Sequence, residues 1–229
     1  AGASEPLVRW LGRRGGGQGR EPNVVANAAP VDISGALRDA LFERVDTAVL
    51  TSATLATHAG FDFVRRRIGL LHGGVRVEEA VFPSPFDYEE QTLVAIPTDV
   101  PFPSGAEATA LDGATARVVA DLAAMSDGGI FVLFTSYRSL RRVADDLRRR
   151  GVDQRWPLFV QGEAQRARLV EAFAASGRGI LLGVASFWEG VDVPGRPLRG
   201  LVITKLPFKV PSEPLTAARV EAIEREGGN

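Results

Sequence analysis

Four short apolar segments, separated by stretches with helical periodicity, dominate the second half of the 229-residue sequence. The clearest covers residues 129–134, Gly-Ile-Phe-Val-Leu-Phe, and the others cover residues 157–160, 180–184 and 201–203. A strand that is apolar on both sides is buried on both faces, which is typical of parallel sheets covered by helices. The alternation of such strands with helices predicts an α/β fold with a mainly parallel sheet.

The segments between these strands have the spacing of amphipathic helices. After the first strand, apolar residues recur at i, i+3, i+4 and i+7, and these are Leu140, Val143, Ala144 and Leu147. Gly151 then ends this helix. Further helices are predicted over residues 114–125, 163–175 and 213–225.

The first part of the chain is less regular. Residues 1–22 contain a glycine- and arginine-rich stretch that predicts a flexible loop. Apolar runs predict strands at residues 23–28, 47–50 and 91–96, and helical spacing predicts helices from Ser34 and over residues 61–68. The proline-rich residues 82–86 mark the predicted domain boundary, since proline interrupts regular structure.

Composition excludes several classes of protein. Lysine and arginine number 27 against 28 acidic residues, so the net charge of −1 provides no global basic field. Cysteine is absent and there are two histidines, which excludes disulfides, thiolate metal sites and a histidine-rich zinc site. No apolar run approaches the roughly 18 residues of a membrane helix. We expect a soluble, cytoplasmic protein with no metal ligands and no membrane partner.

Polar residues gather where the predicted strands end. Thr135, Ser136 and Tyr137 follow the first strand, and Gln161 follows the second. Residues 186–195, Ser-Phe-Trp-Glu-Gly-Val-Asp-Val-Pro-Gly, follow the third. Parallel strands end at one edge of the sheet, where α/β folds bind ligands, so we expect these residues to converge there.

The segment at residues 186–195 offers several groups for binding a nucleotide. It combines Ser186, an aromatic pair that we expect to be exposed, two carboxylates and two glycines. Gly190 allows the backbone to approach a phosphate or a ribose. Asp192 offers an acceptor to a ribose hydroxyl or a magnesium-bound water. A tight turn with surface carboxylates is the alternative on pattern alone.

A second hydroxyl cluster, Thr51, Ser52 and Thr54, follows the predicted strand at residues 47–50. Hydroxyls at a strand end can hydrogen-bond near a nucleotide. Helix capping is the alternative explanation for such a cluster.

Taken together, these segments resemble the DinG subgroup of XPD-like superfamily-two DNA helicases. Residues 51–55 resemble helicase motif III, residues 134–137 resemble motif IV and residues 186–195 resemble motif V. The linking phrases at residues 83–86, 161–162, 205–208 and 211–215 also match in order and spacing. The resemblance covers residues 24–229, and its most specific part is motif V.

The resemblance implies a RecA-like fold in two parts. Residues 1–75 would be the end of the first RecA-like motor domain, and residues 82–229 the second, truncated before motif VI. The full-length protein would couple ATP hydrolysis to unwinding or translocation on single-stranded or forked DNA, 5′ to 3′, in DNA repair or replication. We expect it to be a monomer.

The resemblance also implies roles for individual residues. Gly190 and Asp192 would face the nucleotide, and Trp188 would stack on a base or pack between domains. Arg138, Arg141 and Arg142 would form a solvated helix face or contact DNA. The coupling residues would be Thr51, Ser52 and Thr54, and the DNA-binding residues would be Thr135, Ser136, Tyr137, Gln161 and Ser186.

The departures from the family pattern bear on activity. The chain contains no Gly-x-x-x-x-Gly-Lys-Ser/Thr string, no acidic box and no final arginine motif, so we assign no catalytic residue and expect the fragment alone to be inactive. ATP and Mg²⁺ would bind mainly to the first motor domain. The resemblance allows an iron–sulfur cluster elsewhere in the full-length protein. The alternative is a free-standing, non-catalytic α/β module that binds nucleic acid or a protein partner.

Overall fold

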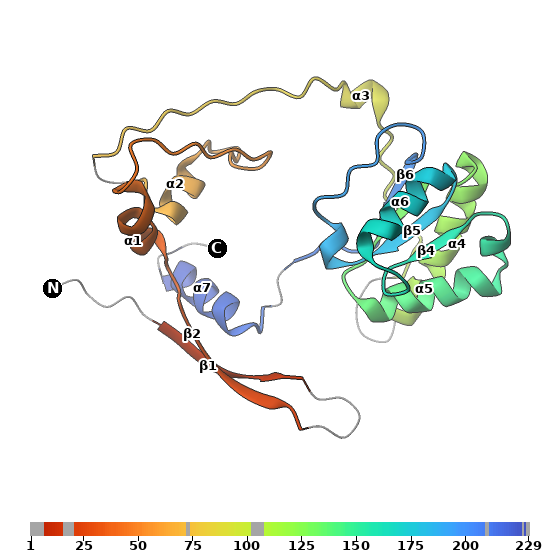
Figure 1. Ribbon diagram of the computed structural model, residues 1–229, viewed down its shortest axis with the longest axis horizontal. Coiled ribbons are helices and arrows are strands. Elements are labelled where there is room, and N and C mark those ends of the chain that lie inside the picture. Colours follow the sequence, from red (N-terminus) through yellow and green to blue (C-terminus); the bar gives the residue numbers. More distant parts are fainter. Residues whose placement is uncertain are drawn as a thin grey trace. The chain divides into compact units, whose positions relative to one another are not determined.

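The computed structural model describes residues 7–15, 21–71, 74–101, 108–208, 211–225 and 227 (Figure 1). The chain divides into two compact units, one formed by residues 1–93 with 209–229 and the other by residues 94–208. Part of the predicted glycine-rich loop, residues 16–20, lies outside the described residues. The predicted division into two motor-domain parts stays a prediction.

A four-stranded parallel sheet forms the centre of the unit at residues 94–208. Its strands are β3 (Ile130–Leu133), β4 (Leu158–Val160), β5 (Ile180–Gly183) and β6 (Gly200–Ile203), in the order β4-β5-β3-β6. Ile130 lies opposite Ile180 on one side and opposite Gly200 on the other. The predicted α/β fold with a mainly parallel sheet is therefore confirmed.

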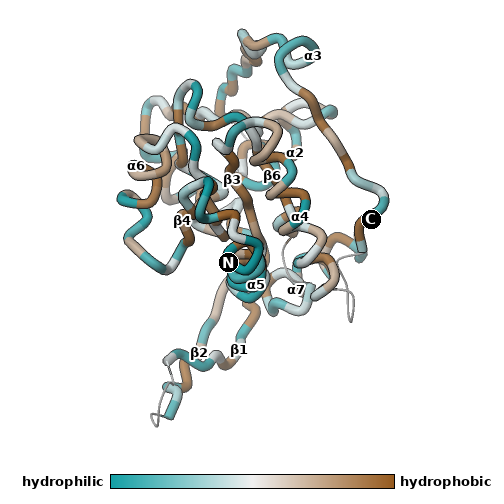
Figure 2. The backbone as a smooth tube through the Cα atoms, turned by 90° about the vertical axis from the view of Figure 1, so that its right-hand side faces the viewer, coloured by the Kyte–Doolittle hydropathy of each residue, from teal (hydrophilic) through white to brown (hydrophobic). Residues whose placement is uncertain are grey.

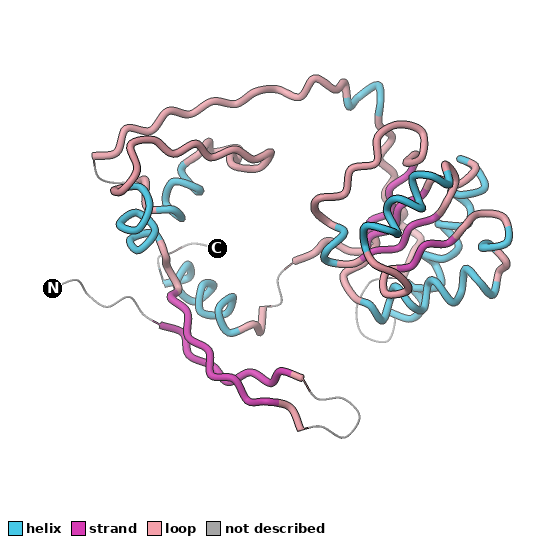
Figure 3. The backbone as a smooth tube through the Cα atoms, in the orientation of Figure 1, coloured by secondary structure: helices cyan, strands magenta, loops and turns pink. Residues whose placement is uncertain are grey.

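Helices cover both faces of this sheet, as Figure 3 shows by the cyan helices around the magenta strands. They are α4 (Ala108–Ser126), α5 (Tyr137–Arg149) and α6 (Arg166–Ser176), with short 3₁₀ turns η3 (Val152–Gln154) and η4 (Ala185–Phe187). The predicted helices in this unit are confirmed, although α6 begins three residues later than predicted. Gly151, with φ of +70°, follows α5 as expected.

Alternate residues of β3, β4 and β5 enter two separate hydrophobic clusters, whereas in β6 only Val202 packs against one of them and Leu201 and Ile203 are exposed. Ile130 and Val132 pack with residues of α4 and α5, whereas Phe131 and Leu133 pack with Leu169 and Phe173 of α6. The hydropathy colouring of Figure 2 is accordingly brown along β3. Burial of both faces explains why these strands are continuous apolar runs.

The other unit contains an antiparallel hairpin. Its strands are β1 (Leu7–Arg14) and β2 (Asn23–Pro30), with Leu7 opposite Pro30. The predicted strand at residues 23–28 is confirmed, but the predicted loop at residues 12–20 is wrong for residues 12–14, which end β1. Charged residues and a glycine interrupt the apolar pattern of β1, because much of its surface is exposed.

Short helices complete this unit. They are α1 (Ser34–Leu37), which continues into the π-helical turn η1 (Arg38–Phe42), α2 (Asp62–Ile68), α3 (Tyr88–Gln91) and α7 (Pro214–Arg225). Helix α7 contacts β1, and Arg219 Nε donates to the carbonyl of Val31 at 3.2 Å. Helix α7 thereby packs with the hairpin, and both belong to the unit that does not contain the parallel sheet.

Two predicted strands are wrong. Residues 47–50 and 92–96 have extended or irregular backbone, and Gln91 ends α3. Val49 and Leu93 are 83% and 93% exposed, and within the described ranges no strand pairs with either segment. An apolar run indicates a preference for burial, but a strand also needs a neighbouring backbone to bond with.

The central position of β5 predicts a large stability effect for Leu182→Ala. Leu182 is fully buried, and truncation of such a leucine should lower the free energy of unfolding by about 2–5 kcal/mol. Urea denaturation of the 229-residue chain, followed by circular dichroism, measures this. Met125→Ala, at an exposed position on α4, should change it by less than about 0.5 kcal/mol. Equal values for both variants would contradict the assigned core.

Candidate functional site

The residues that follow the four parallel strands meet at one edge of the sheet. This edge carries Tyr137 after β3, Gln161 after β4, Ser186 after β5 and Thr204 after β6. Thr204 hydrogen-bonds back to the carbonyl of Leu133 through both its backbone N–H and its hydroxyl, each at 3.1 Å. Thr204 therefore ties β6 to β3, and the other three side chains are available for a site.

The side chain of Gln161 connects three strand ends. Its Oε1 accepts from the backbone N–H of Val184 at 2.6 Å. Its Nε2 donates to the hydroxyl oxygen of Tyr137 at 2.8 Å and to that of Ser186 at 3.0 Å. The structure thus brings together three residues predicted for the same surface, although they lie 24 and 25 positions apart in sequence.

This network determines what the two hydroxyls can offer to a ligand. Bonding to the N–H of Val184 fixes the orientation of the Gln161 amide, because only its oxygen can accept. Each amide hydrogen then points to one hydroxyl oxygen, and each hydroxyl keeps its own O–H as a donor. Tyr137 and Ser186 are exposed, so this edge presents two donors suited to an acceptor-only group such as a phosphate oxygen.

The other two predicted residues after β3 have different environments. Ser136 is the N-cap of α5, and its hydroxyl oxygen accepts from the backbone N–H of Ser139 at 3.2 Å. Thr135 is exposed beside it. Tyr137 is the first residue of α5. The N-terminal end of a helix carries a partial positive charge, which favours anions.

Three arginines follow on α5, and their environments differ. Arg142 donates to Thr109 at 3.1 Å and forms an ion pair with the buried Asp112 at 3.4 Å. Arg142 therefore connects α5 to α4. Arg138 and Arg141 are exposed on the first turns of the same helix.

The aromatic pair Phe187 and Trp188 is not exposed, so that expectation is wrong. Phe187 is 1% exposed and packs edge-on against Phe131. Trp188 is half-buried against the same cluster, and its Nε1 donates to the carbonyl of Phe134 at 3.0 Å. The turn η4 directs both rings into the domain, because the hydrophobic face of the sheet lies beneath it.

Asp192 lies between two inward-facing valines. Val191 is half-buried and Val193 is 8% exposed, and both contact the hydrophobic cluster formed with α6. Their burial turns the intervening Asp192 outward, where it is exposed. Gly190 precedes them with φ of +64°, a left-handed conformation that glycine adopts without strain.

Arg166, at the start of α6, contacts this loop, although the sequence patterns did not identify it. Its Nη2 donates to the carbonyl oxygens of Glu189 and Gly190 at 2.8 and 2.7 Å. The sequence could have indicated this residue, because Arg166 lies at the N-terminal end of the helix predicted there, where a cation interacts unfavourably with the helix dipole. Such a residue at that position indicates a contact outside the helix.

The predicted coupling residues lie in the other unit. Ser52 Oγ lies 3.3 Å from Thr54 Oγ1 and accepts from the backbone N–H of Thr54 at 3.2 Å. Thr51, Ser52 and Thr54 are exposed in an irregular segment. Their predicted link to the edge of the parallel sheet stays a prediction, because the two units are described separately.

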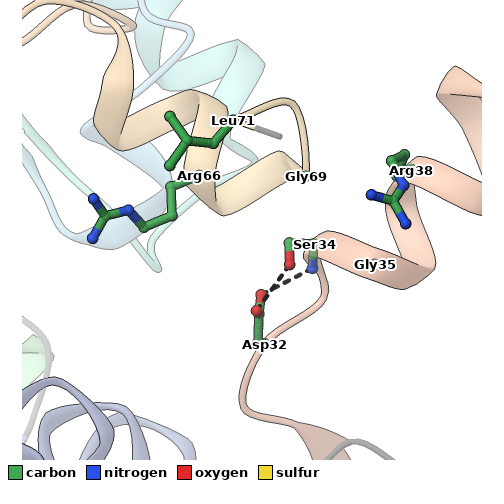
Figure 4. Close-up of a pocket in the computed structure, with 7 residues that line it drawn as sticks. All are labelled: Asp32, Ser34, Gly35, Arg38, Arg66, Gly69 and Leu71. Atoms are coloured by element: carbon green, nitrogen blue, oxygen red, sulfur yellow. Dashed lines mark hydrogen bonds between the residues drawn. The ribbon is translucent and has the colours of Figure 1, made fainter. Parts of the chain in front are cut away.

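A cavity of about 350 Å³ lies in the same unit (Figure 4). In it, the carboxylate of Asp32 accepts from the backbone N–H and the hydroxyl of Ser34 at 2.9 and 2.8 Å. Arg38 and Arg66 line it as well, so both signs of charge are present. None of the predicted site residues lies in it.

In the described part of the chain, no three histidine, aspartate or glutamate side chains are grouped so that they could hold a metal ion. None of its helices combines the length and the apolar character needed to cross a membrane.

Comparisons with known proteins give consistent matches. Residues 119–229 match the family described as helicase C-terminal domain. The chain is 33% identical to the ATP-dependent DNA helicase DinG of Photobacterium profundum, over 98% of this chain and 32% of that protein. It is 34% identical to the 3′-5′ exonuclease DinG of Bacillus subtilis, over 93% of this chain and 23% of that protein. It is 30% identical to the ATP-dependent DNA helicase YoaA of Escherichia coli, over 87% of this chain and 30% of that protein.

These matches therefore include nearly all of this chain but only part of each relative. The chain spans 23% to 32% of the length of these three curated relatives.

The Gln161 network predicts a stability effect for Gln161→Leu. Leucine removes the acceptor for the buried N–H of Val184, which should lower the free energy of unfolding by about 1–3 kcal/mol. Gln165→Leu is the matched control, since Gln165 is exposed and makes no side-chain capping bond to α6. Urea denaturation measures both. A Gln161→Leu variant as stable as the control would show that the network does not hold the strand ends together.

Proposed function

The chain belongs to the DinG/YoaA family of helicases through its helicase C-terminal domain, and on this premise we propose how that domain acts. In the proposal, the chain is part of an ATP-dependent DNA helicase. The full-length protein couples ATP hydrolysis to unwinding or translocation on single-stranded or forked DNA. Movement is 5′ to 3′, and the process served is DNA repair or replication.

The observation that carries the DNA part of this proposal is the donor pair made by Tyr137 and Ser186. Gln161 occupies one acceptor position on each hydroxyl, so both O–H groups donate outward. Hydroxyl donors contact phosphate oxygens, which every nucleotide carries whatever its sequence. Thr135 and Ser136 extend this surface, and a motor that moves along any sequence needs such contacts.

Electrostatics supports the same assignment. The N-terminal end of α5 adds backbone donors and a partial positive charge beside Tyr137. Arg138 and Arg141, exposed on the first turns of α5, add local positive charge near this edge. A net charge of −1 is therefore compatible with DNA as a partner, because the basic groups are local.

The nucleotide part of the proposal rests on Gly190 and Asp192. The outward carboxylate of Asp192 offers an acceptor to a ribose hydroxyl or to a magnesium-bound water. The residues that cradle the phosphates in this family have no counterpart in the sequence, so we assign them to a first motor domain. In the proposal, residues 1–75 end that domain, residues 82–229 form most of the second, and Thr51, Ser52 and Thr54 couple the two.

The hydroxyl pair predicts weaker DNA binding for Tyr137→Phe and Ser186→Ala. Each removes one donor to a charged phosphate, so each should raise the dissociation constant for single-stranded DNA, with a combined loss of about 10-fold or more. Fluorescence anisotropy with a labelled oligonucleotide and the full-length protein measures this.

Tyr88→Phe is the matched control for the tyrosine variant. Tyr88 is exposed, and its hydroxyl accepts from Ser84 at 3.0 Å in the other unit. This variant should bind DNA as the unmodified protein does. If the double variant also bound DNA normally, Tyr137 and Ser186 would not be the proposed phosphate contacts.

The assignment of Asp192 predicts slower ATP turnover in Asp192→Ala. Loss of the carboxylate should reduce DNA-stimulated ATP hydrolysis by the full-length protein about 10-fold or more, measured by phosphate release. Asp153→Ala, an exposed aspartate in η3, is the control and should leave turnover unchanged. The 229-residue chain alone should hydrolyse no ATP. Unchanged turnover in Asp192→Ala would refute its role.

A further inference from the structure

Helix α6 starts in a way that is unfavourable for a helix alone. Its N-cap, Gln165, makes no side-chain capping bond, and its first turn contains no acidic residue. Arg166 places a cation at the positive end of the helix dipole, where anions are favoured. A residue that breaks a local rule in this way indicates a compensating interaction elsewhere.

The compensating interaction is with the loop that follows η4. One nitrogen of the guanidinium, Nη2, donates to two successive carbonyl oxygens, those of Glu189 and Gly190. The same guanidinium lies 5.6 Å from the centre of the Phe187 ring. Hydrogen bonds from a charged donor are stronger than those between neutral groups, so Arg166 connects α6 firmly to this loop.

The contact lies between two parts of the loop that are anchored in the core. Before it, Phe187 is buried and Trp188 bonds to the carbonyl of Phe134. After it, Val191 packs against the same cluster and Val193 is buried. Glu189 and Gly190 are exposed between these anchors, and Arg166 donates to both of their carbonyl oxygens.

Gly190 has a left-handed backbone conformation beside the same contact. A Cβ at Gly190 would lie 3.4 Å from Arg166 Nη2, and the residue has φ of +64°. Glycine loses more conformational freedom on ordering than any other residue. Without a partner for its carbonyl, Gly190 would leave this conformation readily, and Asp192 is two residues further along the chain.

We propose that Arg166 is a positioning residue, which holds residues 188–193 in the conformation that presents Asp192 to the nucleotide. The proposal rests on the function proposed above for Asp192. Arg166 itself contacts neither nucleotide nor DNA in this role. Its effect passes through the two carbonyls, and Phe187 beneath it limits the directions in which the loop can move.

The test uses Arg166→Ala and Arg166→Lys in the full-length protein, with two readouts. In Arg166→Ala, hydrogen exchange should be at least about 10-fold faster at the two protected amides of this segment, that of Trp188, which bonds to the carbonyl of Ala185 at 3.1 Å, and that of the buried Val193, while exchange in β5 and α6 is unchanged. DNA-stimulated kcat for ATP hydrolysis should fall about 10-fold, with single-stranded DNA affinity within about 2-fold of the unmodified protein. Arg166→Lys should recover part of both losses, because an ammonium group can still reach a carbonyl.

Arg168→Ala is the matched control, since Arg168 is exposed in the same turn of α6. It should change neither readout. Normal exchange or normal kcat in Arg166→Ala, together with low turnover in Asp192→Ala, would overturn this inference and leave the proposed function intact. Normal turnover in Asp192→Ala would overturn the proposed role of Asp192, and this inference with it. Unchanged exchange in β5 identifies a variant that still folds.

Discussion

Parallel alignment of four strands is the constraint on which the rest of the domain depends. Parallel strands need crossover connections, and here the helices α4, α5 and α6 cover the two faces that such a sheet must bury. The same alignment brings every strand's carboxyl end to one edge. Tyr137, Gln161 and Ser186 meet there only because β3, β4 and β5 all run in the same direction.

The loop after β5 shows how a hydrophobic core can orient polar groups. The cluster formed with α6 includes Phe187, Val191 and Val193. Because these side chains point inward, neighbouring residues of the loop point outward. Ser186 faces Gln161, and Asp192 faces solvent. Within one short segment, burial thereby separates the hydroxyl assigned to DNA from the carboxylate assigned to ATP.

Local pattern predicted the parallel unit well and the other unit poorly. Strands β3 and β5 are apolar throughout because both faces are buried, so their sequence alone identifies them. Val49 and Leu93 are equally apolar, yet they are exposed, because a strand needs a partner that composition does not reveal. The site divides in the same way. Strand ends predicted Gln161 and Ser186, but the buried ring of Phe187 and the reach of Arg166 depend on tertiary packing.

The hydrogen-bonding groups around Gln161 at the sheet edge are uncharged, in contrast to arginine side chains. The side chains of glutamine, serine and tyrosine are uncharged hydrogen-bonding groups near neutral pH. In the function proposed above, their contact with a phosphate would therefore depend weakly on ionic strength, whereas the attraction of exposed arginines is screened within about 10 Å in ordinary buffers. The proposed DNA contact at this edge would then be lost only in part as the salt concentration rises.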